Sequence, residues 1–418
     1  MEFARVTAGS GAGATAQDML RMCRHYDSSQ WKPPEVLRQE QWLKLLSLLD
    51  WSDKFIPFYR QRFREAGIKP AKISGLEEFR AIPLLSRKDL EDAGINGLKP
   101  GGFSCVPTRT SGTSGRKLTI WIGPDYGTLT VFPLWRRALK AGGLRSGDRY
   151  QRITYLGRGV YPTLGRTQDI ELRDATRDIL ARLYASQPNA VLAIPATLEH
   201  LGLEILRQGA GPPESLRRIF TCGEHLNQSS RHLIRQAFAL NPVDQYAATE
   251  VSSGIAWQCE QREGYHVNID NLIVEILDDR NEPVPSGKKG RLVVTDLSSR
   301  PVPLIRYDIG DLASWQAHQC RCGRTLPCLK EVVGRDIERI RLRSGEWLTV
   351  HDIAGALYEV PDALQFQVRE RHDGCIVVDI VMRPARNGEK ALDDFRRALM
   401  KTVLATVDWK LNPVRSIK

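Results

Sequence analysis

Residues 190–221 read AVLAIPATLEHLGLEILRQGAGPPESLRRIFT and contain the pattern that decides the fold. The apolar run over 190–194 predicts a buried strand, residues 197–208 favour a helix, and residues 218–221 favour a second strand. A strand, a helix and a strand in this order form a βαβ unit. Such units build a parallel sheet with helices packed against it.

The same alternation extends outward in both directions. Further strands are expected at 118–122 and 150–156, and further helices at 36–66, 128–141, 174–186 and 229–239. After Gly254 the pattern changes to closely spaced strands, at 272–277, 290–296 and 312–315, which favours an antiparallel β subdomain.

The last segment has a third pattern, with strands at 337–342, 365–371 and 376–382 and a helix at 390–402. We therefore predict an α/β protein with two domains. A large N-terminal domain over 1–335 holds the mixed βαβ sheets and the antiparallel subdomain, and a small α+β domain covers 336–418.

Composition restricts the class of protein. The 418 residues are 42% hydrophobic and 26% charged, which is typical of a folded enzyme. No stretch approaches the roughly 18 apolar residues of a membrane span, so we expect a cytoplasmic protein. The formal charge of +11 fits nucleic acid, an anionic surface or an anionic substrate, or simply a solvated basic surface, because the cations are scattered.

The segment TRTSGTSGRKL, residues 108–118, combines glycines, hydroxyl groups and cations. Glycines allow a close approach to an anion, and successive N–H groups with hydroxyls and cations complete a phosphate site. The P-loop of nucleotide triphosphatases is excluded, because no Gly-Lys-Ser/Thr follows. The alternative is an ordinary surface turn.

Two later segments carry further ligand chemistry. In DQYAATEVSSG, residues 244–254, Tyr246 offers a flat face for a purine, while Thr249 and Glu250 offer ligands for Mg²⁺ and phosphate. The alternative is a core tyrosine and a helix-capping glutamate. In PLIRYDIGDL, residues 303–312, Asp311 follows Gly310 and suits the two hydroxyls of a ribose. The alternative is a simple turn. In a fourth segment, residues 332–345, Arg335 and Asp336 lie where the pattern changes between domains.

Together, in this order, the four segments resemble the adenylate-forming superfamily, and more narrowly its phenylacetate-CoA ligase branch. The segments FIPFYRQRFREAGIKPAKI and IPLLSRKDL within 55–90, and the later CGEHL, HVNIDNLIVEIL and CRCGRTLP, are also similar to that branch. The resemblance covers about residues 40 to 385.

The resemblance implies a role for each matching residue. The loop that closes on the β- and γ-phosphates of ATP would be formed by Thr110, Ser111, Gly112, Thr113, Ser114 and Gly115. Nucleotide and acyl contacts would come from Gly223, Glu224, Tyr246, Ala247, Thr249, Asp311 and Arg335. Tyr246 would stack on adenine, Glu250 would hold Mg²⁺, and Asp311 would bind the ribose. The catalytic set implied is Thr113, Glu250 and Arg335.

The chemistry implied is the attack of a carboxylate on the α-phosphorus of ATP and transfer of the acyl group from the adenylate to coenzyme A. The expected partners are a carboxylic acid, most simply an aromatic one, ATP and coenzyme A, with neither nucleic acid nor membrane. Relatives are commonly homodimers. The alternatives are transfer to an amine, a hydroxyl or a carrier-protein thiol, and a noncatalytic nucleotide-binding protein. A zinc-containing nucleic-acid-binding protein finds no support in a basic helix or aromatic-basic alternation.

The cysteines predict a separate site. Cys259, His266, Cys320 and Cys322 supply a Cys₃His set, from which a tetrahedral zinc site can be built. Some relatives are similar at these positions, which favours structural zinc. Cys328 is a spare ligand, and the alternative is a group of buried thiols that bind nothing.

The chain departs from the family at its end. The family's C-terminal domain has about a hundred residues and delivers a lysine from a late Gly-Lys pair; here that pair is missing. Neither Lys410 nor Lys418 has the family context, so we assign the lysine role to neither.

Overall fold

The computed structural model describes residues 13–98, 103–109, 119–154, 169–251, 254–298, 302–335, 339–342, 347–349, 360, 363–371, 373–382 and 388–414. Contacts divide the chain into two compact units. The first comprises Met1–Ile194, Pro213–Gly223 and Pro242–Val333, and the second Pro195–Pro212, Glu224–Asn241 and Gly334–Lys418. The domain boundary after residue 335 remains a prediction.

The first unit is built on one mixed sheet, which confirms the predicted α/β class. Its parallel strands are β3 (Tyr150–Thr154), β4 (Ile170–Glu171), β5 (Ala190–Ala193), β6 (Arg218–Cys222) and β7 (Val243–Ala247). The remaining strands are β8 (Gly254–Trp257), β9 (Tyr265–Val267), β10 (Leu272–Leu277), β11 (Lys289–Asp296), β12 (Tyr307–Trp315) and β13 (Cys328–Arg335). Among the described residues, the strand order is β10-β11-β12-β13-β9-β8-β7-β6-β5-β3-β4.

The expected βαβ unit is present, with β5 and β6 as parallel neighbours in which Ala190 pairs with Arg218. The antiparallel strands predicted after Gly254 continue the same sheet, because β8 pairs antiparallel with β7 and sets Trp257 opposite Gln245. This pairing also covers the edge that β7 would otherwise leave open.

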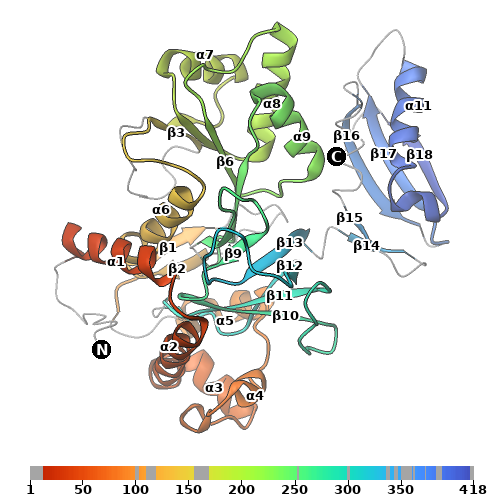
Figure 1. Ribbon diagram of the computed structural model, residues 1–418. Coiled ribbons are helices and arrows are strands. Elements are labelled where there is room, and N and C mark those ends of the chain that lie inside the picture. Colours follow the sequence, from red (N-terminus) through yellow and green to blue (C-terminus); the bar gives the residue numbers. More distant parts are fainter. Residues whose placement is uncertain are drawn as a thin grey trace. The chain divides into compact units, whose positions relative to one another are not determined.

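Helices on the first unit come mainly from the N-terminal third of the chain. They are α1 (Ala16–Ser29), α2 (Pro34–Phe55), α3 (Pro57–Glu65), α4 (Leu76–Arg80), α5 (Arg87–Leu98), α6 (Phe132–Ala141) and α7 (Thr176–Ser186), with a 3₁₀ turn at Pro70–Lys72 and a π-helical turn at Gly127–Val131. Helices α2 to α5 pack against β8 to β13 in one apolar core, and α3 and α4 lie below β10 and β11 in Figure 1. A two-stranded ribbon of β1 (Val106–Arg109) and β2 (Thr119–Ile122) completes the unit.

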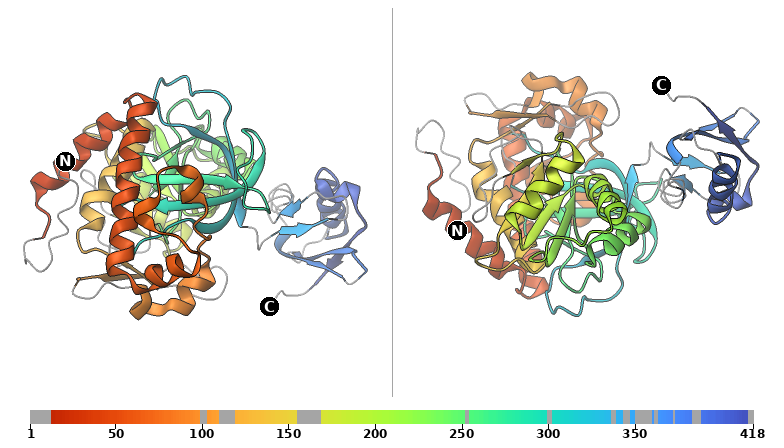
Figure 2. Two further views of the ribbon diagram at one scale, coloured as in Figure 1. Left: turned by 90° about the horizontal axis from the view of Figure 1, so that it is seen from below. Right: turned by 90° about the horizontal axis from the view of Figure 1, so that it is seen from above.

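Local sequence explains two of the helix ends. Pro57 breaks the long apolar pattern as predicted, because a proline lacks the amide hydrogen that would continue α2 and instead begins α3. Thr15 and Asp18 form a capping box at the start of α1. Helix α1 lies beside α6, as both views of Figure 2 show.

A buried arginine joins these two helices to the sheet. Arg137 of α6 donates to Asp270 at 2.5 and 3.0 Å and to Asn268 at 2.5 Å, and it also reaches the hydroxyl of Ser29 at 3.2 Å. The Ser29 hydroxyl itself donates to Asp270. Both side chains are buried, and the two Nη atoms of Arg137 and both carboxylate oxygens of Asp270 are hydrogen-bonded, whereas Nε of Arg137 has no hydrogen-bond partner among the described residues. A buried ion pair is tolerated when such hydrogen bonds accompany it.

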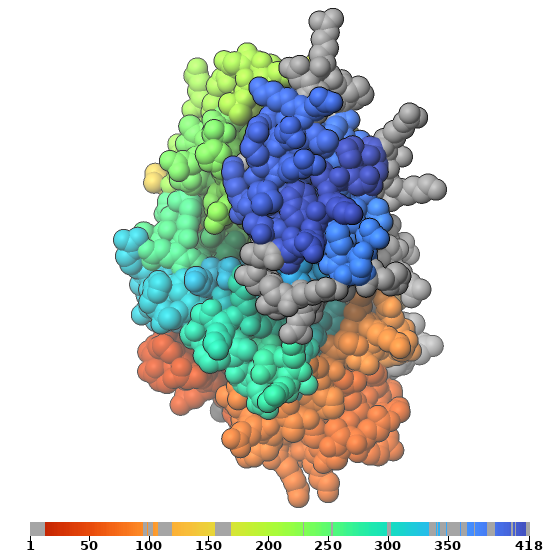
Figure 3. Space-filling view, turned by 90° about the vertical axis from the view of Figure 1, so that its right-hand side faces the viewer, coloured from red at the N-terminus to blue at the C-terminus, as the bar shows by residue number. Residues whose placement is uncertain are grey.

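The second unit contains α8 (Pro195–Gln208), α9 (Gln228–Phe238) and the C-terminal segment. A Cβ on Gly202 would lie 3.0 Å from that of Ala237, so α8 and α9 approach closely at this glycine. The C-terminal segment comprises β14 (Arg339–Arg341), β15 (Trp347–Thr349), β16 (Ala363–Glu370), β17 (Ile376–Met382), α11 (Gly388–Leu399), a 3₁₀ turn at Val403–Thr406 and β18 (Trp409–Pro413). It forms one body, blue in Figure 3, with sheet order β16-β17-β18.

None of the helices in the described part of the chain combines the length and the apolar character that crossing a membrane requires.

Candidate functional site

The segment that carries Asp311 is shaped by a bulge in β12. The register between β11 and β12 shifts between Arg291 and Val293, and Gly310 has φ of 85°. A bulge with a glycine in the left-handed region redirects the next side chain without steric cost. The backbone amide of Gly310 donates to the Asp308 carboxylate at 3.0 Å, which fixes the turn before Asp311.

Arg306, just before this segment, has φ of 52° although it is not a glycine. Its guanidinium is buried and donates to Glu275 at 3.0 Å and to the carbonyl of Ile82 at 2.7 Å, and it also meets the carbonyl of Arg80. Strained backbone of this kind persists only where its surroundings hold it, and it is frequent beside functional sites. Arg306 thus anchors the start of β12.

Tyr246 and Asp311 come together from different motifs. The Tyr246 hydroxyl, on β7, donates to Oδ2 of Asp311 on β12 at 2.5 Å, across 65 positions of sequence. A flat aromatic ring and a carboxylate therefore meet at one place in the first unit. Ala247 ends the same strand and Thr249 lies in the turn that follows.

Glu250 lies at the end of that turn and is 6% exposed. Its partner among the described residues is Arg87, whose guanidinium nitrogen lies 3.5 Å from Oε1. Arg87 also pairs with Glu91 at 3.0 Å. Leu85 bridges to Tyr307, so the segment before α5 runs along β12 and brings Arg87 to this place. Sequence reasoning missed Arg87 as a site residue, although it lies within the segment IPLLSRKDL.

The other predicted site residues are placed as follows. Gly223 follows β6 with φ of 83°, and Glu224 accepts a hydrogen bond from the amide of Ala196 at the start of α8 at 3.1 Å. Arg335 is the last residue of β13. Asp336 and the whole phosphate loop, Thr110 to Gly115, lie outside the described residues.

The predicted zinc ligands are brought together. One ligand atom each from Cys259, His266, Cys320 and Cys322 lies within 4.8 Å of the others. The sulfurs of Cys259 and Cys320 are 3.6 Å apart, and Cys322 Sγ is 3.3 Å from His266 Nε2. Tetrahedral zinc with its usual bond lengths sets two thiolates about 3.8 Å apart, so the spacing fits this metal.

The chemistry of the four groups also fits a metal. Burial lowers the pKa of His266 to about 4, so its ring is neutral near neutral pH and Nε2 has a lone pair to offer. The other nitrogen, Nδ1, lies 3.4 Å from the carbonyl oxygen of Leu326 and 3.3 Å from Cys328 Sγ. A hydrogen bond from Nδ1–H to the carbonyl would fix the orientation of the ring and leave Nε2 for the metal. Burial raises the pKa of Cys259 and Cys320, so without a cation both thiols stay protonated.

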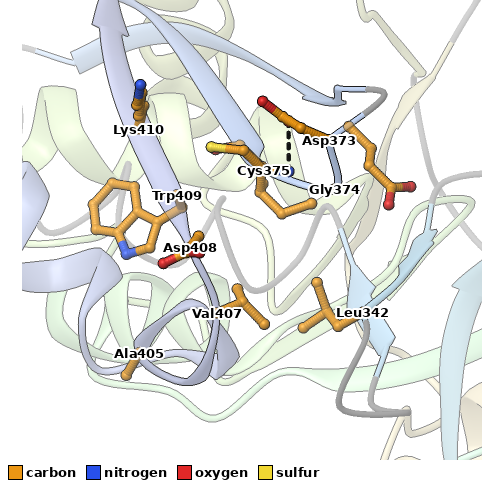
Figure 4. A pocket seen from close by; sticks show the side chains of 11 residues that line it. Leu342, Asp373, Gly374, Cys375, Ala405, Val407, Asp408, Trp409 and Lys410 are labelled. Carbon is orange, nitrogen blue, oxygen red and sulfur yellow. Dashed lines mark hydrogen bonds between the residues drawn. The ribbon is translucent and has the colours of Figure 1, made fainter.

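Lys410, one of the two late lysines, lies on β18 in a groove of the C-terminal segment (Figure 4). Among the described residues, none of those predicted for the nucleotide or the zinc lines this groove. Its lining residues are Leu342, Glu370, Asp373, Gly374, Cys375, Ile376, Ala405, Val407, Asp408, Trp409 and Lys410.

Comparisons with known proteins identify the family of this chain. The family described as AMP-binding enzyme matches residues 162–297. The phenylacetate-coenzyme A ligase of Thermus thermophilus is 28% identical over 365 residues, 82% of this chain and 80% of the relative. That of Pseudomonas putida is 30% identical over 304 residues, 66% of each chain. This chain belongs to the adenylate-forming superfamily. Its branch is that of the phenylacetate-CoA ligases, which confirms the sequence-based prediction.

Crystal structures of another CoA ligase have the same fold as this chain. The crystal structure of 2-hydroxyisobutyryl-CoA ligase in the postadenylation state, in complex with 2-HIB-AMP, has a TM-score of 0.75 at 21% identity and covers 90% of this chain and 86% of that one. The thioesterification state of the same ligase, with 2-HIB-AMP and CoA, has a TM-score of 0.64 at 19% identity and covers 98% of this chain and 92% of that one.

Proposed function

We propose that this chain activates an aromatic carboxylic acid with ATP as an acyl adenylate and then transfers the acyl group to coenzyme A. Its family makes it an AMP-forming acid-CoA ligase, and the relatives named above as phenylacetate-coenzyme A ligases support an aryl acid as the substrate. The observation that carries the proposal is the contact of Tyr246 with Asp311 at 2.5 Å, because it joins a surface for adenine to a carboxylate for ribose.

The reaction has two steps. An oxygen of the substrate carboxylate attacks the α-phosphorus of ATP, the bond from that phosphorus to the bridging oxygen breaks, and pyrophosphate leaves. The sulfur of coenzyme A then attacks the acyl carbonyl, its proton is lost, and AMP leaves. Catalysis of this kind depends on positioning and on neutralising charge.

The roles proposed for the chain's residues follow that division. Tyr246 and Asp311 orient the nucleoside, and the loop from Thr110 to Gly115 holds the leaving phosphates together with Arg335. Glu250 holds the magnesium ion, which when bound neutralises phosphate charge. Gly223 supports this arrangement, because its φ of 83° leaves the backbone open to a close ligand.

The test is carboxylate-dependent exchange of labelled pyrophosphate into ATP, measured over aryl, aliphatic and amino acids. We expect exchange with aryl acids, followed by an acyl-CoA thioester in mass spectra when coenzyme A is added. Exchange without thioester would reject coenzyme A in favour of another acceptor. A complete lack of exchange would reject the enzyme function.

We also propose structural zinc at Cys259, His266, Cys320 and Cys322, supported by their spacing and burial. Freshly purified protein should contain one zinc per chain by inductively coupled plasma mass spectrometry. Cys320→Ser should lower this content, whereas Cys375→Ser, at a half-buried cysteine of the C-terminal segment, should not. Metal-free wild-type protein of full stability would contradict the proposal.

The cytoplasmic location, the division into domains after residue 335, a homodimer, and the lack of nucleic-acid and membrane partners stay predictions.

A further inference from the structure

A buried tyrosine connects the strand after the predicted phosphate loop to the turn that carries Glu250. Tyr126 follows β2 and is 6% exposed. Its hydroxyl lies between two acceptors, 2.8 Å from the carbonyl oxygen of Val251 and 2.6 Å from Oδ2 of Asp296. A phenol has one proton, and both acceptors lie within hydrogen-bond distance of it. Tyr126 therefore joins two segments that lie 125 and 170 positions further along the chain.

Asp296 is itself held in place, so the Tyr126 hydroxyl has a fixed anchor. Asp296 is the last residue of β11 and is 1% exposed. Its other carboxylate oxygen, Oδ1, accepts from the amide of Ser298 at 2.9 Å and from the Ser298 hydroxyl at 2.7 Å. In the register of the sheet, Asp296 lies opposite Leu272 of β10. Both oxygens of this carboxylate are thus engaged, and its position is set by the sheet.

Val251, the second acceptor, follows Glu250 directly and closes the same turn. Its amide donates to the carbonyl of Ala248 at 3.1 Å, so Glu250 occupies a central position of a four-residue turn. The Glu250 carboxylate contacts Arg87 at 3.5 Å, which is longer than a normal hydrogen bond and does not fix its direction. The direction of the carboxylate therefore depends on its backbone, and the hydrogen bond at the Val251 carbonyl holds that backbone.

A widened helical turn sets the direction in which Tyr126 points. The π-helical turn over Gly127–Val131 begins directly after Tyr126 and runs into α6. A π-helical turn holds one residue more than an α-helical turn, which rotates the preceding side chain by about 100° about the helix axis. Such turns are rare, and many of them lie at functional sites. An uninterrupted α-helix would point Tyr126 away from Val251.

The segment before Tyr126 leads to the other half of the proposed nucleotide site. Strand β2 pairs antiparallel with β1, so that Arg109 lies opposite Thr119. These two residues flank the predicted phosphate loop in the sequence. The paired ribbon and Tyr126 thus connect the segment assigned to the leaving phosphates with the carboxylate assigned to the metal.

We propose that Tyr126 is a positioning residue, which holds the turn at Val251 so that the Glu250 carboxylate meets the magnesium ion at the phosphates of ATP. The inference rests on the proposed function and adds a residue that none of the four motif segments contains. Tyr126 acts through the backbone and does not itself contact the ion. Groups that orient a metal ligand contribute about 10- to 100-fold to metal affinity or activity.

The test is Tyr126→Phe, which removes the hydroxyl and keeps the buried ring. The half-saturating Mg²⁺ concentration for pyrophosphate exchange should rise by about 10-fold. At saturating Mg²⁺ the rate should return close to that of the wild type, and KM for the acid should stay unchanged. Metal binding is also measured without turnover, by titrating Mn²⁺ in the presence of the uncleavable analogue α,β-methylene-ATP and following the free ion by electron paramagnetic resonance. The Mn²⁺ dissociation constant should rise by the same factor.

Tyr59→Phe is the matched control, because it removes another buried hydroxyl that donates to a backbone carbonyl, that of Pro303 at 2.6 Å. Both variants should lower the urea midpoint of unfolding, since each loses a buried hydrogen bond. Only Tyr126→Phe should weaken metal binding.

Unchanged metal constants in Tyr126→Phe, or an equal change in Tyr59→Phe, would overturn the inference while wild-type exchange still supports the proposed function. Absence of exchange by the wild type with every acid would overturn the proposed function and this inference with it.

Discussion

Two arginine-carboxylate pairs in the first unit differ in how completely each carboxylate is bound. Arg137 and Asp270 have side chains 0% and 1% exposed, and both carboxylate oxygens accept from the guanidinium. Glu250 is also buried, at 5% side-chain exposure, but Arg87 is 25% exposed and touches it through one contact of 3.5 Å.

The difference separates a structural pair from a pair available for ligand binding. Asp270 has its oxygens occupied by Arg137 and Ser29, so it contributes to packing and has no room for a cation. Glu250 is held loosely by a cation that is shared with Glu91. A buried carboxylate with a long, shared contact can exchange it for a metal ion at small cost, which suits the role proposed for it.

The largest expected effect comes from breaking the structural pair. Arg137→Met leaves the Asp270 charge buried without its partner, and the free energy of unfolding should fall by about 3 to 5 kcal/mol. Urea denaturation measures it. Arg136→Met is the control, because the side chains of Arg136 and its partner Asp27 are both partly exposed. This substitution should lower the free energy of unfolding by about 1 kcal/mol or less. Equal losses of unfolding free energy in Arg137→Met and Arg136→Met would contradict the structural role assigned to the buried pair.

Substitution of Glu250, which pairs with Arg87, should lower enzymatic activity instead of stability. Glu250→Gln removes the proposed metal ligand, and pyrophosphate exchange at saturating Mg²⁺ should fall by about 100-fold or more, the scale for losing one group that stabilises transition-state charge. The urea midpoint should change little. Glu91→Gln, which removes the other partner of Arg87, should retain exchange. Retained exchange in Glu250→Gln would contradict the assignment.

A smaller effect on activity should follow from removing the hydrogen bond between Tyr246 and Asp311. Tyr246→Phe keeps the ring but loses the hydrogen bond to Asp311, which is worth about 0.5 to 1.5 kcal/mol, so KM for ATP should rise by about 3- to 10-fold. Steady-state kinetics with varied ATP measures this change. Tyr184→Phe on α7 serves as the control and should leave KM unaltered. An unchanged KM in Tyr246→Phe would place the nucleotide elsewhere.

The smallest effect concerns pH. Burial alone would raise the pKa of Asp270, but the Arg137 guanidinium and the Ser29 hydroxyl hold it below its usual value. A lowered folded-state pKa stabilises the protein above the unfolded value of about 3.9, and this contribution is lost as pH falls through the folded pKa. The stability of the wild type relative to Asp270→Asn should therefore be constant from pH 7 to about 5 and shrink below about 4. Acid titration of both by circular dichroism tests this, and a constant difference down to pH 3 would contradict it.

Much of the fold could be predicted because its signals are local. The strands 272–277 and 376–382 have the bounds expected from their apolar residues, and Pro57 separates α2 from α3 as expected. Strands β8 and β9 were not predicted, because four and three residues carry too little periodicity to be distinguished from turns.

By itself, the sequence determined the family, the α/β class and the chemical types of Tyr246, Glu250 and Asp311, since ordered motifs and local periodicity are written along the chain. Only the tertiary structure decided which groups pair: Arg87 meets Glu250 across 163 positions, Arg137 meets Asp270 across 133, and Tyr126 meets Asp296 across 170. The physical reason is that hydrogen bonding between distant side chains depends on the register and packing of the sheet, and a side chain's own neighbours in sequence do not encode either.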